Sequence, residues 1–347
     1  MENKTFDTNM VVENKIKKSD VRWFSVDDEP FKIYGVWREG ESYHRVPQPV
    51  ADTISPGIKV MCTGTAGGRI RFVTDSPYVA IQVEYGRYEL SQIITNLAMV
   101  GFDMYDGTRY AGAFRPDKNF AGGSLESVID LPTDGAERLI TINMPLYSEI
   151  KSLYIGVADG SKLAHAPDYK YEKPVVFYGS SITNGAAASR PGAAYEARIS
   201  RELDMNYHCL GFGGLAKAEV EIAEYISTLD MSAFVYDYDH NAKTLEYLEE
   251  THERMFKTVR EKNPDLPILM ISRPNTCDTA DARFEIIKRT YDNARAAGDE
   301  NVYILRGTDF FGEYGNDCTV DGTHPSDLGF FFMAKGIAPV LRRMLEG

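Results

Sequence analysis

The stretch "VVFYGSSITNG", residues 175–185, decides the fold of the second half of this chain. Four apolar or aromatic residues run into Gly179, and Ser180 and Ser181 follow it. An unbroken apolar run that stops at a glycine predicts a strand buried on both faces, as in a parallel sheet. The paired serines then have two interpretations. They cap a helix that follows the strand, or one of them is a nucleophile held at the edge of the sheet.

Short apolar runs alternate with helical spacing from this stretch to the end of the chain. We expect strands over 175–179, 206–212, 234–239, 267–272 and 302–307. We expect helices, from apolar residues recurring at three and four, over 193–203, 245–263, 282–298 and 329–345. This order predicts an α/β domain with three layers, in which helices cover both faces of a parallel sheet.

The first half follows a different period. From Trp23 to about Val157, apolar residues alternate with polar ones, and "GGRIRFVTDSPYVAIQVEY" (67–85) predicts a hairpin that turns at 75–77. Several short strands at this spacing indicate an antiparallel β-sandwich. The chain is therefore divided into a polar lead-in, a sandwich domain and an α/β domain, over 1–21, 22–170 and 171–347.

Composition limits the partners of the protein. With 38 Lys and Arg against 51 Asp and Glu, the formal charge is −13, which argues against nucleic acid and against anionic membranes. No stretch approaches the ~18 apolar residues of a membrane span, and no secretion signal is visible. The four cysteines lack C-x-x-C spacing, so we expect free thiols, a cytoplasmic location and no metal or cofactor.

Polar and glycine residues follow the predicted strands where ligands of open parallel sheets bind. They are Ser180 and Ser181, Gly213 and Gly214, Asn241, and the pair Asp321 and His324. Each has a structural explanation by itself, as a cap, a tight loop or a turn. Together they supply a nucleophile, a base, a group that orients the base, and donors for an oxyanion. That combination favours acyl transfer. Because G-x-S places Ser181 where the strand turns into a helix N-terminus, we expect Ser181 rather than Ser180 to react.

At this point the sequence resembles a known family, the SGNH (GDSL-like) hydrolases. The motifs that carry the resemblance are G-x-S-I-T at Ser181, G-F-x-G at Gly214, D-x-N at Asn241, and D-x-x-H-P at Asp321 and His324. It is closest to the branch with an N-terminal β-domain and a G-x-D-L-Y signature. Further stretches resemble that branch, namely "GFDMY" (101–105), "ASRPG" (188–192), "ISRP" (271–274) and "HPSDLGF" (324–330).

The resemblance implies a fold and a set of roles. The expected fold is an SGNH-type, flavodoxin-like sheet domain preceded by a jelly-roll-like sandwich. Ser181 would attack an ester carbonyl, His324 would act as the base, and Asp321 would orient the imidazole. The N–H groups of Ser181 and Gly214 and the side-chain amide of Asn241 would form the oxyanion hole.

Two positions depart from the family pattern. Ser180 replaces the usual aspartate, and we expect it to support the loop rather than react. Leu215 stands where an asparagine usually follows Gly214. The leading prediction is a serine esterase acting on a short acyl ester, most plausibly an O-acetyl group on an oligosaccharide. The alternatives are a degenerate carbohydrate-binding protein, and a lysophospholipase or thioesterase. The oligomeric state is open.

Overall fold

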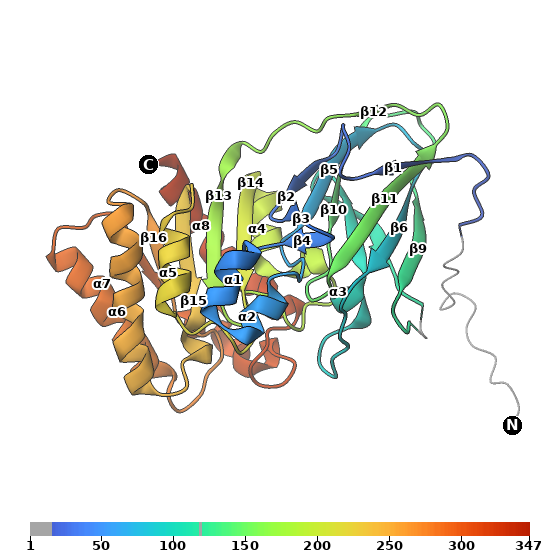
Figure 1. Cartoon of the computed structure of the whole chain (residues 1–347). Coiled ribbons are helices and arrows are strands. Elements are labelled where there is room, and N and C mark those ends of the chain that lie inside the picture. Colours follow the sequence, from blue (N-terminus) through green and yellow to red (C-terminus); the bar gives the residue numbers. More distant parts are fainter. Residues whose placement is uncertain (1–15, 118–119) are drawn as a thin grey trace, which may run out of the picture.

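The computed structural model describes residues 16–117 and 120–347, so most of the expected lead-in 1–21 lies outside the described residues. Two antiparallel sheets form the first half of the described chain (Figure 1). The smaller sheet has the order β1 (Val21–Ser25), β11 (Ile150–Ala158), β6 (Tyr78–Tyr85), β9 (Ser124–Asp130). The larger sheet has the order β12 (Leu163–Ala164), β5 (Arg69–Thr74), β10 (Arg138–Asn143), β7 (Phe102–Asp106), β8 (Arg109–Phe114), with β2 (Lys32–Tyr34) also paired to β5.

Short elements complete this half of the chain. They are the pair β3 (Trp37–Glu39) and β4 (Ser42–His44), and the helices α1 (Gln48–Ile54), α2 (Pro56–Met61) and α3 (Asn96–Val100). The predicted antiparallel sandwich is confirmed by this arrangement of sheets.

The expected hairpin over 67–85 is wrong, because β5 and β6 belong to different sheets. The connecting residue Ser76 is buried, and its hydroxyl accepts a hydrogen bond from the Ala158 N–H at 3.0 Å. Alternating apolar residues on both strands face the space between the sheets, where they pack face to face rather than edge to edge. Alternation alone does not distinguish these two ways of burying a strand.

The second half is a parallel sheet with helices on both faces, which confirms the predicted fold class. Its strand order is β14 (Met205–Gly211), β13 (Tyr171–Gly179), β15 (Ala233–Asp237), β16 (Ile268–Ile271), β17 (Val302–Leu305). Its α-helices are α4 (Tyr195–Leu203), α5 (Val220–Ser227), α6 (Leu245–Lys262), α7 (Ala280–Ala296) and α8 (Asp327–Glu346). Short 3₁₀ helices are η2 (Pro191–Ala193), η3 (Tyr238–Asn241), η4 (Gly307–Asp309) and η5 (Gly312–Cys318). The helix α5 was not predicted.

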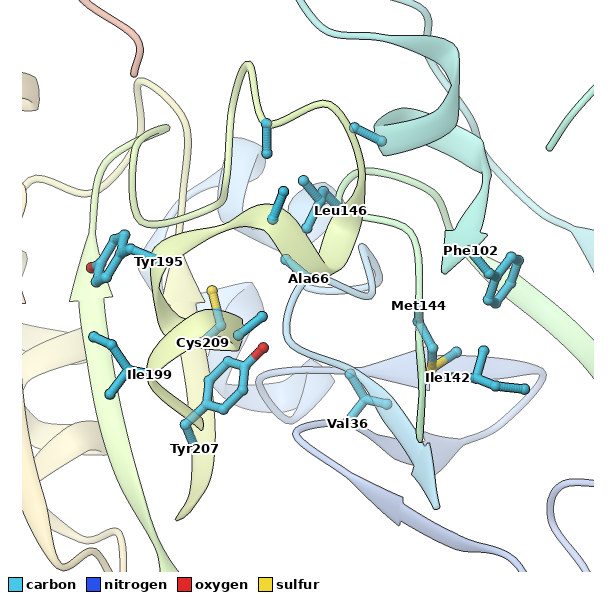
Figure 2. Packing of buried hydrophobic residues seen from close by; sticks show 14 of the residues in the cluster. Val36, Ala66, Phe102, Ile142, Met144, Leu146, Tyr195, Ile199, Tyr207 and Cys209 are labelled. Atoms are coloured by element: carbon cyan, nitrogen blue, oxygen red, sulfur yellow. The ribbon is translucent and has the colours of Figure 1, made fainter. Parts of the chain in front are cut away.

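Alternate residues of the parallel strands enter two separate cores. Val175 and Phe177 of β13 pack with α4 and α8, whereas Val176 and Tyr178 pack with α5, α6 and α7. The first of these cores continues into the sandwich. Figure 2 shows Tyr207 and Cys209 of β14 beside residues of the first half such as Val36, Ala66 and Met144.

Buried arginines of the first half also bond to the backbone of β14. Nη1 of Arg45 donates to the Gly211 carbonyl at 2.8 Å, and Nη2 of Arg69 donates to the Tyr207 carbonyl at 3.1 Å. A shared core with such bonds holds two parts of a chain in one relative position. Loops of the sandwich therefore keep a fixed place near the carboxyl ends of β13 and β14. Among the described residues, no helix is long and apolar enough to cross a membrane.

Candidate active site

Ser181 stands just beyond the carboxyl end of β13, and Gly179 makes that position accessible. A Cβ at Gly179 would lie 1.8 Å from Oδ1 of Asp237 and 2.0 Å from Oγ1 of Thr183. A side chain there would collide with both oxygens, so the close turn over Asp237 requires glycine. The chain bends at this point and leaves Ser181 partly exposed at the edge of the sheet.

The segment after Ser181 differs from the expected helix N-terminus. Residues 181–187 form consecutive turns, η2 follows, and α4 begins only at Tyr195. Gly185 and Ala187 have φ values of 87° and 70°, which a right-handed helix does not admit. In the described chain no regular helix therefore begins directly after Ser181, so the backbone N–H of Ser181 belongs to a turn and not to a helix N-terminus.

Ser180 has a supporting role in this turn. Its side chain is fully buried, and its Oγ accepts a hydrogen bond from the Ile182 N–H at 3.1 Å. A short side-chain acceptor that bonds two residues ahead stabilises a turn. The hydroxyl therefore holds the loop that presents Ser181, as expected for the position where the family has an aspartate.

The structure brings Ser181, His324 and Asp321 together in one row of hydrogen bonds. Oγ of Ser181 lies 2.9 Å from Nε2 of His324, and Nδ1 of His324 lies 2.8 Å from Oδ2 of Asp321. Both distances are within the range in which a base can take a hydroxyl proton and a carboxylate can fix the tautomer of that base. The side chains of His324 and Asp321 are 19% and 30% exposed, so a substrate can reach the row from solvent.

A tight loop sets the position of Asp321. Oδ1 of this residue accepts hydrogen bonds from the N–H groups of Thr323 at 3.0 Å and His324 at 2.8 Å, and Gly322 between them has a φ of 83°. Burial alone raises the pKa of the Asp321 carboxyl, but these N–H donors and the imidazole outweigh it and leave the pKa below its usual value. The residue is thus a turn-former and an ionised neighbour of His324 at once.

Gly214, a predicted oxyanion donor, and its neighbour Gly213 have different surroundings. A Cβ at Gly213 would lie 3.4 Å from Cβ of Ser181, but one at Gly214 would have no atom within 4 Å. Within the described chain, the N–H groups of Ser181, Gly213 and Gly214 have no hydrogen-bond partner. Gly213 is therefore a further candidate. The sequence interpretation placed the glycine pair of G-F-G-G at this edge of the sheet but assigned the oxyanion role to Gly214 alone.

Asn241 ends η3, and its amide points toward the same loop. Nδ2 of Asn241 donates to the Phe212 carbonyl at 3.1 Å, next to Gly213. Two arginines hold the Asn241 loop. Arg273 lies 3.2 Å from Oδ2 of Asp239, and Arg283 donates to the Ala242 carbonyl at 2.9 Å. Arg273 belongs to the "ISRP" stretch, so this stretch holds the loop of Asn241 in position by its ion pair with Asp239.

His240 lies beside these groups but does not join the row. Its Nε2 is buried and has no hydrogen-bond partner among the described residues. Burial, together with the positive charge of Arg273 and a proton on His324, holds the pKa of His240 well below its usual value. The imidazole is therefore neutral and cannot serve as a competing charged acid.

Asp237 lies beneath the Ser181 turn. The hydroxyl of Thr183 donates to its Oδ1, and the hydroxyl of Tyr195 donates to its Oδ2 at 3.1 Å. Burial raises the pKa of Asp237 to about 7, although the Thr183 bond acts in the opposite direction. A buried carboxyl that bonds to Thr183 and touches Gly179 holds the loop from below.

A cavity of about 190 Å³ opens next to Gly213, and loops of the first half form most of its wall. Its apolar lining consists of Val60, Met61, Leu146 and Tyr147. Gly213 lies between Tyr147 and Ser181. A Cβ built on Gly213 would be 3.8 Å from the Tyr147 hydroxyl oxygen and 3.4 Å from Cβ of Ser181. Gly213 therefore links the cavity to Ser181, which itself does not line it. No sequence pattern indicated Tyr147 or Met61.

In the part of the chain that the structure describes, no three or more His, Cys, Asp or Glu side chains are grouped as metal ligands. All four cysteines are free; Cys277 is exposed, and Cys62, Cys209 and Cys318 are buried.

Comparisons with known proteins match both halves. The family model for the GDSL-like lipase/acylhydrolase family matches residues 172–342, and the model for the N-terminus of Esterase SGNH hydro-type proteins matches residues 21–163. A protein from Bacteroides ovatus, described as a GDSL-like lipase, is 31% identical over 94% of this chain and 98% of its own, with a TM-score of 0.83. The chain belongs to the GDSL-like lipase/acylhydrolase family. As a member, it is a hydrolase of the esterase class.

More distant solved structures share the fold of this GDSL-like hydrolase. A salicylyl-acyltransferase from a tetracycline biosynthetic pathway is 19% identical, with a TM-score of 0.75 over 94% of this chain and 98% of its own. An acetyl xylan esterase from the rumen bacterium Butyrivibrio proteoclasticus is 14% identical, with a TM-score of 0.63 over 94% and 99%. A search of curated proteins found no match.

Proposed function

We propose that this GDSL-like hydrolase is a serine esterase that removes a short acyl group, most plausibly acetyl, from a carbohydrate. The observation that carries the proposal is the row from Ser181 through His324 to Asp321, with distances of 2.9 Å and 2.8 Å. A hydroxyl, an imidazole and a carboxylate in this order are the parts of a nucleophilic acyl-transfer site. The row also argues against a degenerate, purely binding role.

The reaction begins when Oγ of Ser181 attacks the ester carbonyl carbon and its proton passes to Nε2 of His324. The tetrahedral intermediate collapses, the C–O bond to the alcohol breaks, and the alcohol oxygen takes the proton from His324. Water then attacks the acyl-serine, with His324 again accepting and returning a proton. Asp321 stays ionised and stabilises the imidazolium at each stage, in agreement with the lowered pKa of its carboxyl.

The negative charge on the carbonyl oxygen is held by neutral donors. The candidates are the N–H groups of Ser181, Gly213 and Gly214 and the amide of Asn241. Unpartnered N–H groups near the nucleophile are available to a developing oxyanion without first breaking another bond. Of the two glycines we favour Gly213, because a Cβ built on it would lie 3.4 Å from Cβ of Ser181, whereas one on Gly214 would meet no atom within 4 Å.

The size of the adjacent cavity supports a short acyl group. At about 190 Å³ it is smaller than the roughly 300 Å³ at which pockets for drug-sized ligands begin. Arg87 and Glu89 also line it, which is unfavourable for a fatty chain. Several solved structures with this fold are described as carbohydrate esterases, one of them an acetyl xylan esterase. We therefore place the acetyl group in this cavity and the sugar outside it.

The division into domains over 22–170 and 171–347 remains our proposal, with the active residues in the second and cavity walls from the first.

The experiment that tests the function is acetate release from a panel of acetylated oligosaccharides. We expect release by the wild-type protein and none by Ser181→Ala. Binding of the oligosaccharides without release would favour a binding protein. Preference for long-chain lysophospholipids would favour a lysophospholipase, and preference for acyl thioesters would favour a thioesterase.

A further inference from the structure

A second cavity, of about 370 Å³, lies between the larger sheet of the sandwich and the helix α4. Strands β5 and β10 contribute one wall and the last turns of α4 contribute another, so the cavity belongs to both halves of the chain. Its lining shares no residue with the cavity beside Gly213. Three arginines, Arg69, Arg71 and Arg201, face it.

Arg71 is the central residue of this cavity. Its side chain is only 3% exposed, and its guanidinium stacks on the ring of Tyr169 at 3.9 Å. Its Nε and Nη1 atoms are buried and have no hydrogen-bond partner among the described residues. Over the same residues, no carboxylate oxygen pairs with it within 4.0 Å. Buried guanidinium groups without partners are rare, because burying an unpaired charge is strongly unfavourable.

The two other arginines leave this charge uncompensated. Each guanidinium nitrogen of Arg69 donates to a neutral acceptor, with Tyr169 Oη at 3.2 Å and the Asn206 amide oxygen at 2.7 Å among them. Arg201 donates Nη2 to the Gly192 carbonyl at 2.7 Å, while its Nη1 is buried and unpartnered. Three guanidinium groups thus share one cavity, and unused N–H groups remain on two of them.

The acidic residues at the cavity are engaged elsewhere. Asp168 forms an ion pair with Lys32 and is half-exposed. Asp204 is exposed, and its Oδ2 accepts a hydrogen bond from the Lys170 N–H at 3.1 Å. Neither carboxylate pairs with an arginine of the cavity among the described residues. The hydrogen bond from Lys32 and, to a smaller extent, the charge of Arg71 lower the pKa of the Asp168 carboxyl. Asp168 accepts no hydrogen bond from Arg71, however, so the buried Nε and Nη1 donors of Arg71 remain without an acceptor among the described residues.

We propose that this cavity binds a phosphate group, either as the free ion or as a small phosphate ester. Guanidinium groups match the oxygens of phosphate with paired N–H donors, and a dianion compensates more than one of them. The volume is within the range of pockets that hold small metabolites, so the site has room for more than the phosphate itself. The site is separate from the proposed esterase chemistry.

Thermal unfolding of the full chain tests the proposal. The probes are inorganic phosphate and glucose 6-phosphate, each compared with chloride at equal ionic strength. We expect both to raise the midpoint of the wild-type protein with a dependence on concentration that reflects binding. Arg71→Met should lose the response, and in chloride it should be at least as stable as the wild type, because it removes an unpaired buried charge. Arg289→Met, at a half-exposed arginine paired with Glu249, is the matched control and should keep the response.

Isothermal titration calorimetry separates the sources of the phosphate group. Tighter binding of glucose 6-phosphate than of inorganic phosphate assigns the site to an ester, and the reverse order assigns it to the free ion. Arg71→Lys keeps the charge but loses the paired donors, and we expect at least tenfold weaker binding. Arg71→Lys also tests the role of Arg71 in binding if the Arg71→Met variant does not fold. An equal response of wild type and Arg71 variants, or no binding of either probe, would show a cavity that holds only water and would overturn the proposal.

Discussion

Oδ2 of the buried Asp103 lies 3.2 Å from Nε of Arg190 and accepts a hydrogen bond from the Gly192 N–H at 2.9 Å. Asp103 is the aspartate of "GFDMY" on β7, and Arg190 and Gly192 belong to "ASRPG", a few residues after Ser181. The "GFDMY" stretch of the first half of the chain therefore contacts the "ASRPG" stretch, which follows Ser181 in the second half. Asp103 is fully buried, so the interaction is shielded from solvent.

The first prediction concerns the stability that this contact provides. Asp103→Ala leaves Arg190 without its buried partner, and losing one member of a buried pair costs about 3–5 kcal/mol. Asp103→Asn keeps an oxygen for the Gly192 N–H and should cost less. Urea unfolding measures both. Asp292→Ala, which breaks an exposed pair with Lys288, is the control and should change the free energy of unfolding by less than about 0.5 kcal/mol. If Asp103→Ala and Asp292→Ala lower the free energy of unfolding equally, the contact of Asp103 with Arg190 and Gly192 does not stabilise the two halves of the chain against each other.

The second prediction separates the two serines. Ser181→Ala removes the proposed nucleophile and should lower kcat by at least about 10⁴-fold. Ser180→Ala removes one buried hydrogen bond of the turn, which costs about 1 kcal/mol of stability, and it should keep a measurable fraction of the activity. A fluorophosphonate probe followed by peptide mass spectrometry should label Ser181. Label on Ser180 would show that the register of the motif has been misassigned.

Much of this site follows from the sequence because strand ends are local features. The apolar run to Gly179 places Ser181 at the edge of the sheet, and D-x-x-H-P gives the Asp321 loop that the structure contains. Other features depend on contacts distant in sequence. The pairing of Asp103 with Arg190 and the wall formed by Tyr147 are examples. The alternation in β5 and β6 was interpreted as a hairpin because it records burial, not the neighbouring strand.

The third prediction concerns Asn241. Asn241→Ala removes one proposed oxyanion donor and should lower kcat by about 10²–10³-fold with little change in KM. Asn241→Asp places an acceptor, and a negative charge, where the donor stood, so its loss should exceed that of alanine. Steady-state kinetics on a soluble acetyl ester measures both. Asn263→Ala is a control, since that amide donates to the Ser227 carbonyl at the end of α5 and to the Val259 carbonyl in α6. If alanine and aspartate leave kcat unchanged, Asn241 does not contact the oxyanion.

The fourth prediction uses the raised pKa of Asp237, about 7 in the folded protein against an ordinary value of 3.8. Between these values the folded state binds a proton that the unfolded state does not. The free energy of unfolding therefore falls as the pH rises from about 4 to 7, by at most on the order of 4 kcal/mol. Asp237→Asn remains neutral and should lack this decline. Its stability relative to the wild type should be greater at pH 8 than at pH 5, as measured by urea unfolding. Parallel pH profiles for the two proteins would contradict a protonated Asp237.

The last prediction concerns acyl-chain length. If the cavity of about 190 Å³ holds the acyl group, kcat/KM should be highest for acetyl or propionyl esters and should fall by the octanoyl ester. Met61 forms part of the apolar wall, and Met61→Ala would enlarge the space next to Gly213. Each methylene that the enlarged cavity buries contributes about 0.8 kcal/mol, or roughly fourfold in kcat/KM. We therefore expect the variant to favour butyryl over acetyl esters relative to the wild type. Leu328→Ala, at an exposed leucine on α8, is the control and should leave the ratio unchanged. A wild-type rate that rises with chain length through octanoyl would place the acyl group elsewhere and the enzyme among lipases or thioesterases.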